Sequence, residues 1–216
     1  MNRHPHHPQH RLKVEYYIYH TPLFVIDAVD SSIDIPLFCT EVEEIIPENL
    51  LENVDVIYIG DFKDLGDKNA AFTNGAIYMI ASEPTTFDML ENFVHELAHS
   101  LEERHGWDIY DESLKNEFLG KRNRLSQLLM ARGFHINPQL YGFTEYNKKF
   151  DEFLANEVGY PTLLNLTMGL FVSPYGATSI QEYFANGFEK YYLDSPRSVR
   201  EISPVLYQKI DAIVNG

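Results

Sequence analysis

The segment from residue 84 to residue 106 has a helical pattern that carries two histidines one turn apart. Apolar residues recur there at intervals of three or four, which places them along one side of a helix. They are Leu90, Val94, Leu97 and Leu101, with Phe93 and Ala98 beside them. Pro84 and the following Thr85–Asp88 resemble a capping box, and Gly106 is a stop signal. We therefore predict a helix over residues 84–106 with one buried face.

The histidines belong to the sequence His95-Glu96-Leu97-Ala98-His99. Four residues turn a helix through about 400°, so the two imidazoles lie about 40° apart on one face. Two imidazoles in this arrangement can bind one Zn²⁺, and Glu96 can then reach beside the ion and accept a proton from a water molecule. The alternative, two solvated histidines on a helix surface, is disfavoured because the apolar residues around them predict a buried surface.

A hydrolytic zinc site needs a third protein ligand and an open coordination position. The candidates are His105, Cys39 and Glu182. His105 has the spacing found in metzincins, with Met168 as the only candidate for the accompanying Met-turn. That arrangement needs the chain to turn after the second histidine, usually at a glycine, and Glu102 stands there. If the helix continues, His105 points about 240° away from the second histidine.

The other two candidates lie far from the motif in sequence. Cys39 is the only cysteine, and its simpler interpretation is a buried free thiol. Glu182 lies near the start of a second amphipathic helix, where its simpler role is to complete a capping box with Ser179. Glu189 on the same helix is an alternative ligand, and Asn186 is placed to hydrogen-bond a ligand histidine. The residues alone leave the third ligand open.

Two motifs together resemble a known group of enzymes. They are His95–His99 and Tyr175-Gly-Ala-Thr-Ser-Ile-Gln-Glu182-Tyr-Phe-Ala, and as a pair they resemble the peptidase domain of anthrax toxin lethal factor and the bacterial Pro-Pro endopeptidases. The resemblance covers residues 50–216 approximately. It implies that Glu182 is the third zinc ligand and that Tyr175, seven residues earlier, donates a hydrogen bond to the oxyanion. It also implies a zincin-like fold of the gluzincin type.

The chain departs from this pattern in its length. Glu182 follows His99 by 83 positions, which is longer than in those families. We attribute the extra length to a helical insertion at about residues 107–170, which could wall the substrate groove. Substrate preference therefore does not carry over from the resemblance.

The organisation of the chain predicts an α+β fold, with a small N-terminal mixed sheet and the active-site helix followed by a mainly helical C-terminal half. Asn74-Gly75 signals a hairpin between two of the strands. The predicted strands are 14–19, 23–28, 54–60, 70–72 and 76–80. A short helix and turn are predicted at 41–53, and further helices at 111–132, 144–156, 161–171, 179–193 and 203–214. We predict a single zincin-like peptidase domain over residues 12–216.

Residues 1–11 contain four histidines among prolines, namely His4, His6, His7 and His10. A metal-binding tract is one interpretation, but we favour a disordered tail.

Composition limits the partners. There are 17 Lys and Arg residues and 32 Asp and Glu residues, which gives a net charge of −15. This charge argues against nucleic acid and anionic membranes as partners. It favours cationic substrates, which the negative charge would attract over long range. No apolar run reaches the length of a membrane span, and no signal peptide is recognisable. We expect a monomer that is cytoplasmic or delivered by a non-classical route.

The sequence thus predicts a zinc-dependent metalloendopeptidase. It would hydrolyse peptide bonds by zinc-activated water, with Glu96 as general base and Tyr175 as oxyanion stabiliser. Strand 76–80 or strand 70–72 could be the sheet edge that pairs with an extended peptide. The alternatives are a catalytically inactive zinc-bound binding or structural module, a zinc hydrolase acting on a non-peptide amide, and a metzincin-type peptidase that uses His105.

Overall fold

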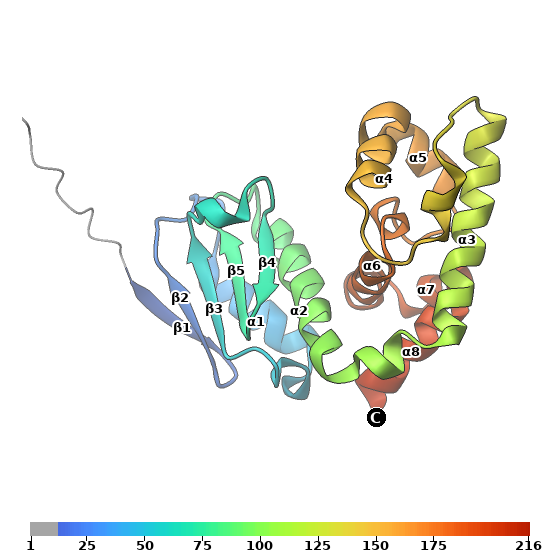
Figure 1. Cartoon of the computed structure of the whole chain (residues 1–216). Helices are drawn as coiled ribbons and strands as arrows, with labels where there is room; N and C mark the ends of the chain where they lie inside the picture. Colours follow the sequence, from blue (N-terminus) through green and yellow to red (C-terminus); the bar gives the residue numbers. More distant parts are fainter. Residues whose placement is uncertain (1–12) are drawn as a thin grey trace, which may run out of the picture. The chain divides into compact units, whose positions relative to one another are not determined.

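The structure of the chain, a computed structural model, describes residues 13–216. The histidine-rich segment 1–11, predicted to be a tail, lies outside the described residues. The described residues form two compact units, 13–93 and 94–216, and the boundary falls within helix α2 (Thr86–Ile109). The first unit contains all the described strands and the second is helical, so the predicted α+β class is confirmed (Figure 1). No helix of residues 13–216 is both long and apolar enough to cross a membrane.

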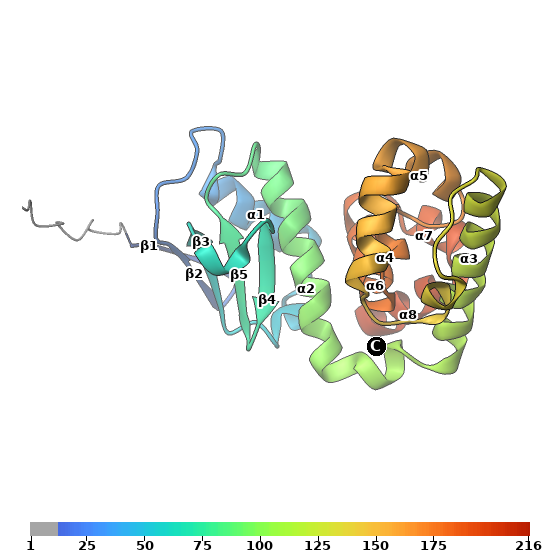
Figure 2. The same ribbon diagram turned by 45° about the horizontal axis from the view of Figure 1, so that its top comes forward.

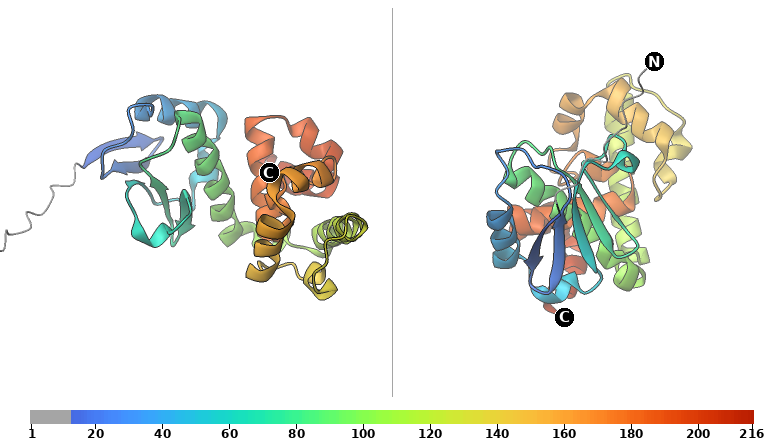
Figure 3. Two further views of the ribbon diagram at one scale, coloured as in Figure 1. Left: turned by 90° about the horizontal axis from the view of Figure 1, so that it is seen from above. Right: turned by 90° about the vertical axis from the view of Figure 1, so that its left-hand side faces the viewer.

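The first unit contains a five-stranded mixed sheet, as predicted. Its strands follow the order β1-β2-β3-β5-β4, and the right-hand view of Figure 3 looks onto them. The strands are β1 (Val14–Ile18), β2 (Thr21–Val25), β3 (Val56–Gly60), β4 (Ala70–Thr73) and β5 (Ala76–Ile80). β3 is parallel to β2 and β5, while β1 and β4 pair antiparallel at the two edges. Strand 76–80 is therefore an interior strand, and the sheet edge on its side is β4.

The alternation of residues gives the sheet one buried face. Ile57 and Ile59 of β3 stand opposite Ile77 and Met79 of β5, and all four side chains are completely buried. The residues between them are aromatic and only partly buried, and Tyr58 stacks on its neighbours across the strands. This period of two is what a half-buried strand requires.

A helix begins earlier than predicted in the connection between β2 and β3. α1 (Ile35–Ile45) starts after Asp34, whose side chain accepts a hydrogen bond from the Leu37 N–H. A 3-10 turn follows at Glu48–Leu51. The prediction of a helix from residue 41 overlooked this N-cap. Phe38 of α1 meets Phe93 of α2 edge to face, with ring centroids 5.6 Å apart.

The predicted hairpin at Asn74-Gly75 is confirmed. Both residues have positive φ, 50° and 78°, as a tight β4–β5 turn requires. The Gly75 carbonyl also accepts the Asp55 N–H at 2.7 Å, which fixes the turn against the start of β3. A Cβ atom at Gly75 would collide with the Asp55 carboxylate.

We predict that Gly75→Ala lowers the free energy of unfolding by about 1–2 kcal/mol or more, because a methyl group disfavours positive φ and meets Asp55. Urea denaturation followed by circular dichroism measures this. Gly120→Ala is the control, since Gly120 lies inside a helix with no atom near its missing Cβ and should gain about 0.5–1 kcal/mol. Equal stability of Gly75→Ala and the native chain would contradict the turn geometry.

Helix α2 continues past Gly106 to Ile109, so the predicted stop at Gly106 is wrong. Two contacts at its end favour the extra turn. Ile109 is buried, and the Lys209 ammonium donates a hydrogen bond to the Asp108 carbonyl at 2.7 Å, where a cation is favourable at a helix C-terminus. The predicted buried stripe of α2 is confirmed, since each of its apolar residues from Leu90 to Leu101 is at most 5% exposed.

The second unit is a group of helices (Figure 2). α3 (Glu112–Ala131) starts close to the predicted residue, with Asp111 as its N-cap, and α6 (Ile180–Leu193) starts at the predicted cap, Ser179. The others are α4 (Lys148–Glu152), which continues as a π-helical turn at Phe153–Val158, α5 (Tyr160–Thr167), α7 (Pro196–Ile202) and α8 (Pro204–Asn215). α4 begins later and α5 ends earlier than predicted, and α7 was not predicted.

Three polar side chains of α3, of which Lys121 and Arg122 are buried and Glu117 is partly buried, join the rest of this unit. Glu117 accepts hydrogen bonds from the Leu206 N–H at the start of α8 and from the Tyr183 hydroxyl of α6. Lys121 donates to the carbonyls of Leu170 and Ile202, each at 2.6 Å. Arg122 is the third, and its contacts are described below. α3 therefore connects α6 and α8 with the segments that end at Leu170 and Ile202. That α3 belongs to an insertion remains a prediction.

Candidate metal centre

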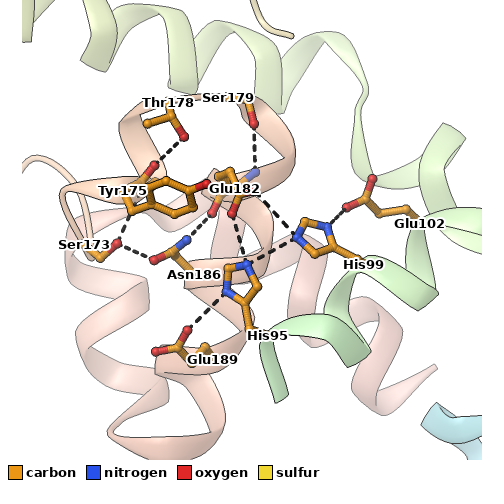
Figure 4. A network of polar contacts seen from close by, with 11 residues as sticks. His95, His99, Glu102, Ser173, Tyr175, Thr178, Ser179, Glu182, Asn186 and Glu189 are labelled. Atoms are coloured by element: carbon orange, nitrogen blue, oxygen red, sulfur yellow. Dashed lines mark hydrogen bonds and ion pairs between the residues drawn. The ribbon is translucent and has the colours of Figure 1, made fainter. Parts of the chain in front are cut away.

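The two motif histidines project from one face of α2. Their side chains are 17% and 21% exposed, so they are not solvated surface residues. The Nε2 atoms of His95 and His99 lie 3.3 Å apart, and their rings are inclined at 72°. Figure 4 shows both imidazoles directed toward α6. The helical spacing of four residues brings these two nitrogen atoms together.

Glu182 reaches the same point from the first turn of α6. The Ser179 hydroxyl accepts the Glu182 N–H at 3.1 Å, so the predicted cap is present. The capping role does not use the Glu182 carboxylate, which faces the histidines. Its Oε2 lies 3.1 Å from His95 Nε2 and its Oε1 lies 3.8 Å from His99 Nε2. His95, His99 and Glu182 thus form a group that could hold a metal ion.

The distances between these donor atoms fit a tetrahedral ion. Zn²⁺ binds imidazole nitrogen and carboxylate oxygen at about 2.0–2.2 Å, so tetrahedral ligand atoms lie about 3.3 Å from one another. The two Nε2 atoms, 3.3 Å apart, and Glu182 Oε2, 3.1 Å from His95 Nε2, lie near that value, while the nearest printed approach to His99 Nε2, 3.8 Å, is made by the other carboxylate oxygen, Oε1. The set supplies three protein ligands, which leaves one position of a tetrahedron for water or substrate.

A carboxylate contacts the far nitrogen of each imidazole. His99 Nδ1 lies 2.7 Å from Glu102 Oε1, and His95 Nδ1 lies 3.3 Å from Glu189 Oε2 (Figure 4). A carboxylate at Nδ1 keeps the proton on that nitrogen and leaves the Nε2 lone pair to face the centre. Carboxylates in this position orient metal-binding histidines in many proteins.

These two positioning glutamates were missed from the sequence. Glu102 follows His99 by three residues, a helical spacing at which side chains meet, and this signal was available. Glu189 was considered as a ligand, but the structure places it behind His95 and not at the centre. Its pairing with His95 depends on how α6 meets α2, which no local pattern specifies.

The charges at the centre favour a cation. Burial lowers the pKa of His95, but the contacts with Glu182 and Glu189 outweigh it and raise that pKa to about 10. The charge of Glu96 contributes to this increase in the pKa of His95. Without a metal ion, His95 is therefore an imidazolium at neutral pH. A metal ion would take over this positive charge and release a proton, as metal binding to histidine does.

Tyr175 lies in a 3-10 turn, Tyr175–Ala177, just before α6. Its ring points toward Glu182 in Figure 4. Burial and the Glu182 charge raise the pKa of its phenol, so the hydroxyl stays protonated and able to donate a hydrogen bond. Glu96 is partly buried on α2 directly after His95. All the residues of this centre belong to residues 94–216.

Asn186 does not contact either imidazole. Its side-chain nitrogen donates to the Glu182 carbonyl at 2.8 Å, and its oxygen accepts a short hydrogen bond from the Ser173 hydroxyl. The Ser173 oxygen in turn accepts the Gly176 N–H at 3.3 Å. Asn186 therefore ties the Tyr175 turn to the first turns of α6.

The other candidate ligands are not part of the group. His105 lies on the continuing helix α2, so the turn that a metzincin-type site requires is absent at that point of the described chain. Met168 is 75% exposed. Cys39 is buried on α1, and burial and the Glu43 charge raise its thiol pKa to about 11. Within residues 13–216, only the His95, His99 and Glu182 group meets the geometry of a metal site.

Comparisons of the chain with protein families, curated proteins and solved structures found no significant match.

We predict that Glu102→Gln weakens Zn²⁺ binding by about 10-fold or more, because the amide no longer holds His99 Nδ1 as a carboxylate does. Competition against a chelator measures the dissociation constant. Glu103→Gln is the matched control, because it removes the same charge from an exposed position one residue away. Equal weakening in both variants would show that only the net charge matters.

Proposed function

We propose that this protein is a zinc-dependent metalloendopeptidase with His95, His99 and Glu182 as the metal ligands. The observation that carries the proposal is the convergence of His95 Nε2, His99 Nε2 and the Glu182 carboxylate, with separations close to those of a tetrahedral site. The fourth position remains available for chemistry, which distinguishes a catalytic site from a structural one.

The chemistry follows from the groups around this set. A bound Zn²⁺ would supply a Lewis acid that polarises a carbonyl group and lowers the pKa of a water molecule. Glu96 follows the first ligand on the same helix and is the group that accepts a proton from the attacking water. It then delivers that proton to the leaving amine, so one carboxylate serves as base and acid.

Tyr175 has the properties of an oxyanion donor. Its phenol is directed toward Glu182, and its raised pKa keeps the proton on the oxygen. A hydrogen bond from this hydroxyl strengthens as the substrate carbonyl oxygen gains negative charge, which lowers the barrier without tightening substrate binding. The two proposed roles can be tested separately, because Glu96 transfers the proton of the attacking water and Tyr175 stabilises the negative charge on the substrate oxygen.

The resemblance to lethal factor and the Pro-Pro endopeptidases is part of the same proposal. A mixed sheet followed by the motif helix and a helical half that supplies the glutamate is compatible with a zincin-like, gluzincin-type domain. An extended peptide is the substrate we favour over other amides, because the families that the two motifs resemble are peptidases. The acidic composition favours cationic peptides.

Glu96→Gln tests the chemistry. We predict that this variant binds Zn²⁺ like the native chain but loses hydrolysis by about 10²–10⁴-fold, because the amide cannot accept the proton. The assay is cleavage of a broad peptide library by the zinc-loaded protein, read by mass spectrometry. A native chain that binds zinc tightly and cleaves nothing would instead identify a catalytically inactive zinc-bound module.

Glu182→Ala tests the ligand set. Removing one of three protein ligands should weaken Zn²⁺ binding by orders of magnitude, whereas His105→Ala should leave it unchanged. Chelator competition on both variants decides between the two sites. A large loss in His105→Ala with none in Glu182→Ala would favour a metzincin-type site.

Tyr175→Phe tests the oxyanion role. We predict that kcat falls by about 10²–10³-fold with little change in KM or zinc affinity, because the lost hydrogen bond forms mainly in the transition state. Tyr146→Phe is the control, since the exposed Tyr146 hydroxyl donates to Asp151 at 2.8 Å. A change in KM alone would assign Tyr175 to substrate binding.

A further inference from the structure

Arg122 is a fully buried cation in the middle of α3. Its guanidinium carbon lies 4.0 Å from the centroid of the Phe150 ring and 5.3 Å from that of Phe118. No carboxylate forms an ion pair with it within residues 13–216. Burial lowers its pKa to about 10, so it remains charged at neutral pH. A buried charge without an ionic partner is costly and is tolerated when hydrogen bonds and ring faces compensate it.

The compensation comes from three backbone carbonyls. Nη1 donates to the carbonyls of Ala177 and Thr178, at 3.1 and 3.2 Å, and Nη2 donates to the Leu140 carbonyl at 2.5 Å. Ala177 and Thr178 join the Tyr175 turn to Ser179, the N-cap of α6. The Arg122 guanidinium thus binds the two residues that lie between the Tyr175 turn and the N-cap of α6, the helix that carries Glu182.

The rest of that peptide is held by neighbouring groups of the same turn. The Tyr175 carbonyl accepts the Thr178 N–H at 3.0 Å and the Thr178 hydroxyl at 2.8 Å. The Ile180 N–H donates to the Thr144 carbonyl at 2.8 Å. Glu182 has a second support in the Ser179 cap, whereas the turn before it is joined to other helices by Arg122 and, through Ser173, by Asn186.

We propose that Arg122 is a positioning residue that fixes the Ala177–Thr178 peptide and thereby holds the Tyr175 phenol beside Glu182. Its consequence for catalysis rests on the proposed function, but its effect on the turn does not. The planar guanidinium suits this role because it donates in fixed directions to several carbonyls at once, which an ammonium group cannot reproduce. Lys121, the preceding residue, binds a different pair of carbonyls.

The first experiment is hydrogen–deuterium exchange on the zinc-loaded full chain carrying Arg122→Lys. We expect faster exchange of the backbone amides of residues 176–180, with α8 unchanged. Arg124→Lys is the matched control, because Arg124 is exposed on the same helix and donates a hydrogen bond to Gln127, within that helix. Unchanged exchange in Arg122→Lys overturns the proposal. If that variant does not fold, Phe150→Leu removes the ring over the guanidinium and must give the same pattern.

The second experiment separates positioning from general stability. Arg122→Lys should lower kcat by about tenfold or more, with KM and zinc affinity unchanged, because the phenol is misplaced. The same change in a Tyr175→Phe background should have no further effect on kcat, since the group it positions is gone. Equal losses in both backgrounds overturn the proposal. If the native chain cleaves no peptide, the proposed function fails, and the exchange result alone decides the role of Arg122.

Discussion

The group formed by His95, His99 and Glu182 requires a positive charge between its electron-donating atoms. Two imidazole nitrogens lie 3.3 Å apart with the Glu182 carboxylate 3.1 and 3.8 Å from them, and carboxylates occupy the far side of both imidazoles. Electron pairs that meet in a half-buried space repel unless a positive charge lies between them. In the isolated chain a proton on His95 supplies it, in keeping with the raised pKa of that imidazole. A divalent cation would supply the same positive charge and could bind His95, His99 and Glu182 together.

The surrounding helices make that convergence possible. α2 places two histidines on one face, while α6 supplies the proposed ligand Glu182 at its first turn and a positioning glutamate two turns later. α3 contributes three polar side chains, each bound to the end of another element. Glu117 binds the start of α8, and Arg122 binds the turn before α6. The helix predicted as an insertion is thus an integral part of the unit that carries the site.

The sequence predicted the features that local patterns determine. The α2 stripe, the β4–β5 hairpin and the cap at Ser179 each depend on residues a few positions apart, and each is present. The end of α2 was misjudged because its last turn is stabilised by Lys209, which lies a hundred residues away in sequence. α7 is short and begins at Ser195 without a side-chain cap, so its start signal is weak.

The residues of the candidate site likewise fall into those that a local pattern predicts and those that depend on contacts between helices. The histidine pair is a local pattern, and the sequence offered three candidates for the third ligand, which the resemblance narrowed to Glu182. Glu189 and Arg122 act across helices, so their roles appear only when α2, α3 and α6 are assembled.

Zinc-edge X-ray absorption spectroscopy can identify the ligands of the proposed site, with half an equivalent of Zn²⁺ on the full chain so that the tightest site fills first. We expect two imidazole ligands and a first shell of nitrogen and oxygen at about 2.0–2.2 Å. Three imidazoles, or a thiolate sulfur at about 2.3 Å, would contradict it.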